Sequence, residues 1–186
     1  NPSLGRRGIR FLLQHPELLR NQLEALQELS SEHDLHILVP LVALPRDMQA
    51  VQRAFREASG ARTASTVPKL GAMIETPAAA LAAVDIAEYA DFASVGTNDL
   101  TQYSFAADRE NATVDDYFDD AHDVIFRLIA TIRSDAPELP LSVCGELAGR
   151  PAAVPRLLEC GITALSVVPT AVPEIKAVVR QHTHNN

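Results

Sequence analysis

Three short segments decide the fold of this chain: AMIETP at residues 72–77, SVGTNDL at 94–100 and SVCGELAG at 142–149. Each begins with small or β-branched apolar residues, which is typical of a buried strand. Each then supplies polar or reactive groups where the apolar run stops. Because the carboxyl ends of parallel strands meet at one edge of an α/β barrel, we expect these groups to lie close together. The segments therefore predict an α/β protein with a site at that edge.

The rest of the chain alternates between helical and strand patterns. In the helix predicted over 16–31, Leu19, Leu23, Leu26 and Leu29 are expected on one buried face. Met48, Val51 and Phe55 play the same part in the helix over 45–58, and a polar linker is expected over 59–68. Strands are predicted over 35–40, 69–75, 91–95, 140–144 and 163–168. The strand over 91–95 is followed by a polar loop and then by helical segments that reach about residue 106. The other helices are predicted over 7–14, 78–88, 124–136, 151–160 and 172–181, with an acidic loop over 112–123.

Regular alternation of strands and helices predicts a parallel sheet covered by helices. A closed eight-stranded barrel usually needs about 250 residues, whereas this chain has 186. With five predicted strands, we expect part of a (β/α)8 barrel of the TIM type, or an open sheet, in a single domain over 1–186. The abrupt start, NPSLGRRGIRFLL without an initiator Met, suggests part of a longer protein.

Composition excludes several classes of function. The formal net charge is −8, which argues against general nucleic-acid binding. No apolar run approaches the length of a membrane span, and the N-terminus has no signal-peptide pattern. The two cysteines, Cys144 and Cys160, do not have the spacing of a metal site or of a disulfide scaffold. We therefore expect a cytoplasmic protein with no nucleic-acid partner and no membrane insertion.

Two carboxylates follow predicted strands in the same way. Glu75 and Asp99 each stand where an apolar run ends. Two oxygen ligands, completed by water and substrate oxygens, are typical of a Mg²⁺ site, and two carboxylates can also form an acid–base pair. A further alternative is that Glu75 only complements a helix dipole, and that Thr97 and Asn98 of a polar loop only cap the next helix. The spacing leaves these alternatives open.

Three more groups could take part in chemistry. Arg109 lies in a polar DREN context and could bind phosphate or carboxylate, although a lone surface arginine is more often simply solvated. Cys144 ends a strand, as the two carboxylates do, and could donate a proton or act as a nucleophile. Cys160 fits a small hydrophobic role. A basic cluster of Arg6, Arg7 and Arg10 could meet an anion or form a solvated helix face.

At this point the segments resemble a known family. ETPAAA, SVGTNDLTQYSFAADREN and VCGELAG are similar to the phosphoenolpyruvate-utilising enzymes. Within that family they resemble the C-terminal phosphoenolpyruvate-binding domain of the phosphoenolpyruvate-protein phosphotransferases, enzyme I of the bacterial phosphotransferase system. NPSLGRRGIR and VVPTAVPEIKAVVR extend the resemblance over nearly the whole chain.

The resemblance implies a role for each matching position. Glu75 and Asp99 match the carboxylates that hold Mg²⁺. Asn98, Asp99 and Arg109 match substrate-binding groups, as does Arg7 in the NP-LG-R motif. Cys144 matches the acid that protonates the enolate carbon to give pyruvate. The implied reaction is phosphoryl transfer from phosphoenolpyruvate to a histidine on another domain of the same protein, and from there to a phosphocarrier protein for sugar uptake. A homodimer is also implied.

The chain also departs from the family pattern. The early barrel strands, with two further phosphate-binding arginines, and the Gly-rich domain of the phosphoryl-accepting histidine do not occur in this sequence. The segment YFDDAHDVIF (117–126) differs as well. We therefore expect this chain alone to bind substrate with little or no turnover. Two alternatives remain at this stage: a Mg²⁺-dependent lyase or aldolase acting on an oxo-acid, and a non-catalytic dimerisation module.

Overall fold

A computed structural model of the chain describes residues 1–59 and 67–184. Its centre is a five-stranded parallel sheet in the order β1-β2-β3-β4-β5, so each strand pairs with the next one along the chain. The strands are β1 (His36–Val42), β2 (Lys69–Ile74), β3 (Phe92–Gly96), β4 (Leu141–Cys144) and β5 (Ala164–Leu165). This all-parallel sheet with surrounding helices confirms the predicted α/β class and is consistent with part of a TIM-type barrel.

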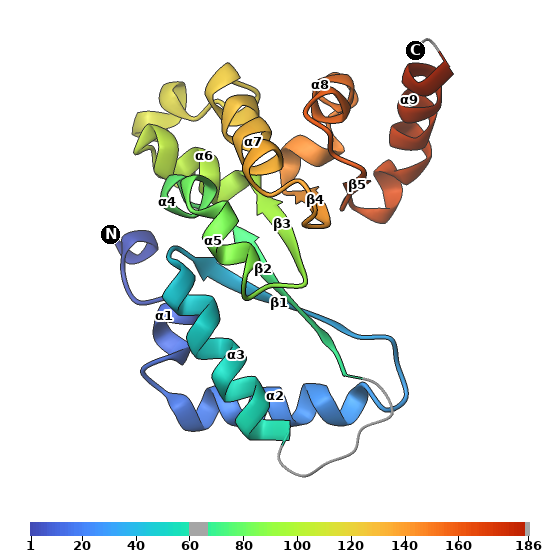
Figure 1. The fold of residues 1–186 in the computed structure, drawn as a ribbon. Coiled ribbons are helices and arrows are strands. Elements are labelled where there is room, and N and C mark those ends of the chain that lie inside the picture. Colours follow the sequence, from blue (N-terminus) through green and yellow to red (C-terminus); the bar gives the residue numbers. More distant parts are fainter. Residues whose placement is uncertain (60–66, 185–186) are drawn as a thin grey trace.

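Helices connect and cover the strands. The α-helices are α1 (Ile9–Leu12), α2 (Pro16–Leu29), α3 (Pro45–Ser59), α4 (Pro77–Leu81), α5 (Ala83–Ala87), α6 (Thr97–Phe105), α7 (Asp123–Asp135), α8 (Val154–Glu159) and α9 (Val172–His184). Short 3-10 turns are η1 (Pro2–Leu4), η2 (Ala112–Tyr117), η3 (Glu146–Gly149) and η4 (Pro169–Ala171). In Figure 1 the arrowheads of β1, β2 and β3 point to the side on which η1 and the N-terminus lie.

The core lies between the sheet and its helices. From β2 and β3, Ala72, Ile74 and Val95 are fully buried, as are Ile125 and Ile129 of α7. Alternation along the strands turns these side chains toward the helices, because successive residues of a strand point to opposite faces. Cys144 follows Val143 in β4 and therefore lies on the other face of the sheet, where it stays half-buried.

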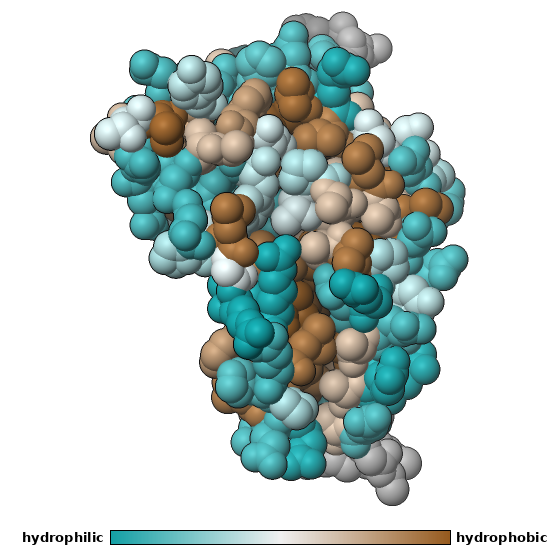
Figure 2. Space-filling model, turned by 90° about the vertical axis from the view of Figure 1, so that its left-hand side faces the viewer, coloured by the Kyte–Doolittle hydropathy of each residue, from teal (hydrophilic) through white to brown (hydrophobic). Residues whose placement is uncertain are grey.

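The predicted helix faces agree with the structure, with one exception. Leu19 and Leu23 of α2 are buried, and so are Met48, Val51 and Phe55 of α3. The prediction that Leu29 shares this face is wrong, since its side chain is 50% exposed. At about 100° per residue, Leu29 stands roughly 80° away from Leu19 around the helix, at the edge of the apolar stripe. Figure 2 shows hydrophobic residues between hydrophilic flanks in its lower half, over α1–α3, where a groove contains Leu13, Pro16, Leu19, Ala50 and Ala54.

Some predicted bounds need correction. The helix expected over 78–88 is divided into α4 and α5 at Ala82, where the backbone (φ −103°, ψ 18°) leaves the helical region. The strand expected over 163–168 is reduced to β5, because only Ala164 and Leu165 pair with β4. Most of the linker predicted over 59–68 lies outside the described residues. Nowhere in the described part of the chain is a helix both long and apolar enough to span a membrane.

Candidate active site

Glu75 follows β2 directly and is buried, with 7% of its surface exposed. Its Oε1 accepts a hydrogen bond from the Leu41 backbone N–H at 2.6 Å. Leu41 has a left-handed φ of 56°, at the point where the register between β1 and β2 shifts. The pKa of Glu75 is raised to about 7, mainly by burial and in addition by the nearby charge of Asp99, against the opposing effects of the Leu41 hydrogen bond and of Arg7. The Glu75 carboxyl is therefore poised between its neutral and charged forms near neutral pH.

Asp99 and Arg7 form a two-bond ion pair across 92 residues of sequence. Arg7 donates from Nη2 to Asp99 Oδ2 at 2.8 Å and from Nη1 to Asp99 Oδ1 at 3.2 Å. The Asp99 side chain is 7% exposed and that of Arg7 is 36% exposed. The hydrogen bond to Asp99 is the main cause that raises the pKa of the Arg7 guanidinium. Of the three clustered arginines, it is thus Arg7 that meets a carboxylate of the site, whereas Arg6 bonds Gln14.

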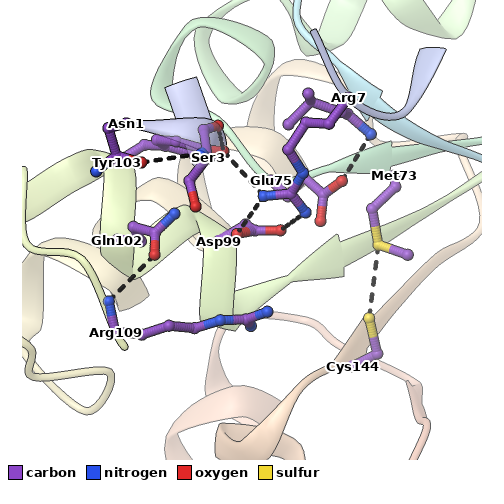
Figure 3. A network of polar contacts seen from close by, with 11 residues as sticks. Asn1, Ser3, Arg7, Met73, Glu75, Asp99, Gln102, Tyr103, Arg109 and Cys144 are labelled. Atoms are coloured by element: carbon purple, nitrogen blue, oxygen red, sulfur yellow. Dashed lines mark hydrogen bonds and ion pairs between the residues drawn. The ribbon is translucent and has the colours of Figure 1, made fainter. Parts of the chain in front are cut away.

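Tyr103 is a member of this cluster that sequence reasoning missed. Its hydroxyl accepts from Arg7 Nη1 at 3.2 Å and donates to the Ser3 backbone carbonyl (Figure 3). Tyr103 lies four residues after Asp99, so both side chains stand on one face of α6. This four-residue spacing is the sequence signal that could have identified Tyr103. Tyr103 therefore ties η1, Arg7 and α6 together.

The polar loop predicted around Asn98 does not exist, because α6 begins at Thr97, directly after β3. Gly96 is the N-cap and no side chain caps the helix, so the alternative that Thr97 and Asn98 serve as caps is wrong. Thr97 Oγ1 donates to the Cys144 carbonyl at 2.9 Å, and Asn98 Oδ1 accepts from the Glu146 N–H at 3.0 Å. Both residues thus fasten the segment after β4 to α6.

Gly145 makes this fastening possible. Its φ is +88°, and a Cβ there would stand 2.4 Å from Thr97 Oγ1 and 2.8 Å from Asn98 Oδ1. A side chain would therefore be strained and would clash. Gly96 plays a similar part beside Glu75, since a Cβ on it would lie 2.7 Å from Glu75 Oε2.

Cys144 ends β4 at the same edge of the sheet. Its Sγ lies 3.7 Å from the Met73 Sδ and 3.4 Å from the Val95 carbonyl oxygen. Burial raises the pKa of the Cys144 thiol, which favours the protonated form at neutral pH. Cys160 is also half-buried, and its Sγ faces the Phe126 carbonyl at 3.6 Å. Of the two cysteines, Cys144 is therefore the one beside the carboxylates.

Arg109 has an exposed side chain, and its backbone N–H donates to the buried Gln102 side chain at 3.1 Å. Figure 3 shows this side chain extending along the site, below Asp99 and in the direction of Cys144. Its guanidinium has no hydrogen bond or ion pair with the rest of the described chain. The fork is therefore available to an anion that reaches this edge.

The donor set of the site suits a hard divalent cation. Two buried carboxylates, Glu75 and Asp99, come close enough for each other's charge to matter, and all their donor atoms are oxygens. Among the described residues no group of three or more His, Cys, Asp and Glu side chains forms a metal cage. Mg²⁺ is commonly held by one or two carboxylates plus substrate oxygens and water, so two carboxylates fit such an ion.

The fold and site together define a parallel α/β domain of barrel type, with buried acids, arginines and a thiol at the carboxyl edge of the sheet. A family model described as the phosphoenolpyruvate-binding domain of phosphoenolpyruvate-utilising enzymes matches residues 1–184. The chain belongs to this family, which confirms the resemblance found in the sequence.

Relatives from several organisms cover nearly the whole chain. A multiphosphoryl transfer protein of Rhodobacter capsulatus is 38% identical over 182 residues, which are 97% of this chain and 22% of that protein. A phosphoenolpyruvate-protein phosphotransferase of Streptomyces coelicolor is 39% identical, over 98% of this chain and 33% of the relative. A probable phosphoenolpyruvate synthase of Methanocaldococcus jannaschii is 38% identical, over 96% and 15%. The chain thus spans a third or less of the length of these relatives.

Proposed function

We propose that the chain, as one domain over residues 1–186, binds phosphoenolpyruvate at the carboxyl edge of its sheet. The observation that carries the proposal is the meeting of Glu75, Asp99 and Arg7 at this edge, beside a thiol that burial keeps protonated. Family membership favours this reading over the oxo-acid lyase and the non-catalytic module. Arg7 and Arg109 would bind the anionic groups of the substrate, since a guanidinium pairs well with phosphate and carboxylate.

Glu75 and Asp99 would hold Mg²⁺ in this proposal. When bound, the cation supplies positive charge for the substrate oxygens and for the charge that grows on the enolate oxygen. Asn98 is proposed at the same subsite through its side-chain nitrogen, because its Oδ1 is already engaged by the Glu146 N–H.

Cys144 is the proposed proton donor. Loss of the phosphoryl group from phosphoenolpyruvate leaves the enolate of pyruvate. The proton of the Cys144 Sγ then moves to the methylene carbon, which gives pyruvate and a thiolate. A thiol with a raised pKa suits this step because it carries its proton at neutral pH.

The wider reaction involves groups outside this chain. We propose that the phosphoryl group passes to a histidine of another domain of the same protein, and from there to a phosphocarrier protein for sugar uptake, in the cytoplasm. A homodimer is proposed as the working form. The chain alone should give no phosphorylated carrier when mixed with phosphoenolpyruvate, Mg²⁺ and the carrier protein. Light scattering tests the dimer.

Calorimetry of the chain with phosphoenolpyruvate, with and without Mg²⁺, tests the binding site. We expect binding that depends on Mg²⁺ and that is lost in Glu75→Gln but kept in the control Glu138→Gln, which changes an exposed glutamate. Equal binding by both variants would contradict the assignment of Glu75.

Deuterium incorporation into the methyl group of pyruvate, in D₂O with Mg²⁺, tests the proton donor. This half-reaction needs no phosphoryl acceptor. Cys144→Ser should lose the exchange and Cys160→Ser should keep it. Exchange that persists in Cys144→Ser at the rate of the unaltered chain would contradict the assignment of Cys144.

A further inference from the structure

In the Arg7–Asp99 pair, Arg7 occupies the carboxylate oxygens that the proposed cation would use. Both Asp99 oxygens already accept a hydrogen bond from the Arg7 guanidinium, at 2.8 and 3.2 Å. Asp99 therefore has a resident counter-charge. A divalent cation on either oxygen would stand within a few ångströms of this guanidinium, and like charges at that distance repel. Arg7 and a divalent cation therefore compete for Asp99.

Arg7 has room to move away from Asp99, and its guanidinium can bind an anion once it has moved. Its side chain is 36% exposed, so it can swing toward solvent without crossing the core. Glu75, which also attracts the guanidinium, lies on the same side as Asp99. Once a cation neutralises the two carboxylates, nothing comparable holds Arg7 there, and its fork becomes free for an anion.

Tyr103 determines how firmly Arg7 is held in the resting arrangement. Its hydroxyl accepts from Arg7 Nη1 and donates to the Ser3 carbonyl, so it is fixed at both ends. Because Ser3 belongs to η1 and Tyr103 to α6, the hydroxyl fixes the segment that carries Arg7 on the helix that carries Asp99. Tyr103 thus favours the paired state of Arg7 without adding any charge of its own.

We propose that Tyr103 is a positioning residue that keeps Arg7 on Asp99, and that a divalent cation releases Arg7 from Asp99 for the anionic substrate. One equilibrium, Arg7 on or off Asp99, then controls the binding of both ligands. Each ligand binds the released state, so each makes the other bind more tightly, and the coupling is reciprocal. This inference rests on the proposed site for Mg²⁺ and phosphoenolpyruvate.

Tyr103→Phe tests the inference because it loosens Arg7 without changing charge. Calorimetry measures Mg²⁺ alone, phosphoenolpyruvate alone, and each in the presence of the other. We expect each ligand alone to bind about threefold or more tightly to Tyr103→Phe than to the unaltered chain, by a similar factor for both. The coupling between the two ligands should fall by that factor. Simple damage to the site would instead weaken binding.

Two further variants sharpen the test. Tyr89→Phe changes another half-buried tyrosine, away from the site, and should leave both affinities unchanged. Arg7→Lys keeps the charge but loses the fork, and should tighten Mg²⁺ binding even if Tyr103→Phe folds poorly. If the unaltered chain binds Mg²⁺ but Tyr103→Phe and Arg7→Lys bind it no more tightly than the unaltered chain does, this inference is overturned while the proposed metal site stands. If the unaltered chain binds no Mg²⁺, the metal assignment falls, and this inference with it.

Discussion

Two buried aspartates of this molecule are paired with arginines, and they are paired differently. Asp99 has both oxygens bonded by Arg7 and has a second carboxyl, Glu75, beside it. Asp120 forms an ion pair through one oxygen, with Arg150 Nη1 2.9 Å from its Oδ1, while its Oδ2 is buried and has no hydrogen-bond partner in the described part of the chain. Burial raises the pKa of Asp120, and Glu146 adds to the effect. The Asp99 pair thus has both oxygens hydrogen-bonded and a second buried carboxyl beside it, whereas the Asp120 pair leaves one buried oxygen without a hydrogen bond.

This difference distinguishes a candidate binding site, at Asp99, from a structural ion pair, at Asp120. Asp120 and Arg150 join the segment before α7 to the residue that ends η3, and a structural link of this kind needs only one ion pair. At Asp99 the chain brings two carboxylates together and balances them with one arginine that has a second partner. Buried like charges are costly, so a fold keeps them where a cation or substrate offsets the cost.

The largest effect is expected from Arg7→Ala, which leaves Glu75 and Asp99 without their cation. At pH 8 the free energy of unfolding should fall by about 2–3 kcal/mol, which is less than the ~3–5 kcal/mol expected for a fully buried pair because Arg7 is partly exposed. The loss should be smaller at pH 5.5, where Glu75 is protonated. Urea denaturation measures both values. Arg150→Ala is the matched control, and an equal loss there would erase the distinction between the two pairs.

Glu75→Gln removes the second negative charge beside Asp99. Because the folded-state pKa of Glu75 is raised to about 7 from an ordinary 4.5, the folded chain binds this proton more tightly than the unfolded chain does. The stabilisation from that proton is complete below about pH 4.5 and is lost as pH rises through 7. Gln cannot lose a proton and can still accept from Leu41. We expect the variant to exceed the unaltered chain by about 2 kcal/mol at pH 8.

Urea denaturation between pH 5 and 8.5 checks this expectation, with Glu138→Gln as the exposed control. The two curves should converge toward the acid end. A variant that is less stable than the unaltered chain at pH 8 would show that the Glu75 charge is already offset in the chain alone.

Asp120→Asn should have a smaller effect, within about 1 kcal/mol at pH 7, because the amide keeps one acceptor for Arg150 but places a donor where Oδ2 finds no partner. The raised pKa of Asp120 means that the unaltered chain loses stability as pH rises through it, and the variant lacks this loss. Comparing the pH slopes of the two chains in urea checks the sign. A loss as large as that of Arg7→Ala would mean that Asp120 carries more of the fold than its single bond suggests.

Much of the fold could be predicted because it depends on local patterns. Apolar runs identified five strands, and Glu75, Asp99 and Cys144 followed from their positions where three of these runs end. The start of α6 at Thr97 could not be predicted, because a strand that passes directly into a helix leaves no loop residues to mark the change. The left-handed backbone conformation of Leu41 could not be predicted either, since a left-handed φ in a leucine has no sequence signature.

Long-range pairs were the other missing part. Arg7 and Asp99 are 92 residues apart, and no spacing rule relates them. The family resemblance brought Arg7 to the site, but neither the two-bond pair nor the role of Tyr103 was contained in it. Periodicity describes what one element does, whereas the contact between η1 and α6 is set by how the elements pack.

Arg109→Gln should have the smallest effect on folding, since the side chain is exposed and a surface substitution usually changes stability by less than about 0.5 kcal/mol. Unlike Arg7, this guanidinium need not leave a carboxylate before it meets an anion. Losing one charge-assisted contact should therefore weaken phosphoenolpyruvate binding about tenfold, while binding of Mg²⁺ alone stays nearly constant. Calorimetry with each ligand separates the two. Arg127→Gln, on α7, is the control, and an equal fall there would assign the effect to net charge and not to the Arg109 fork.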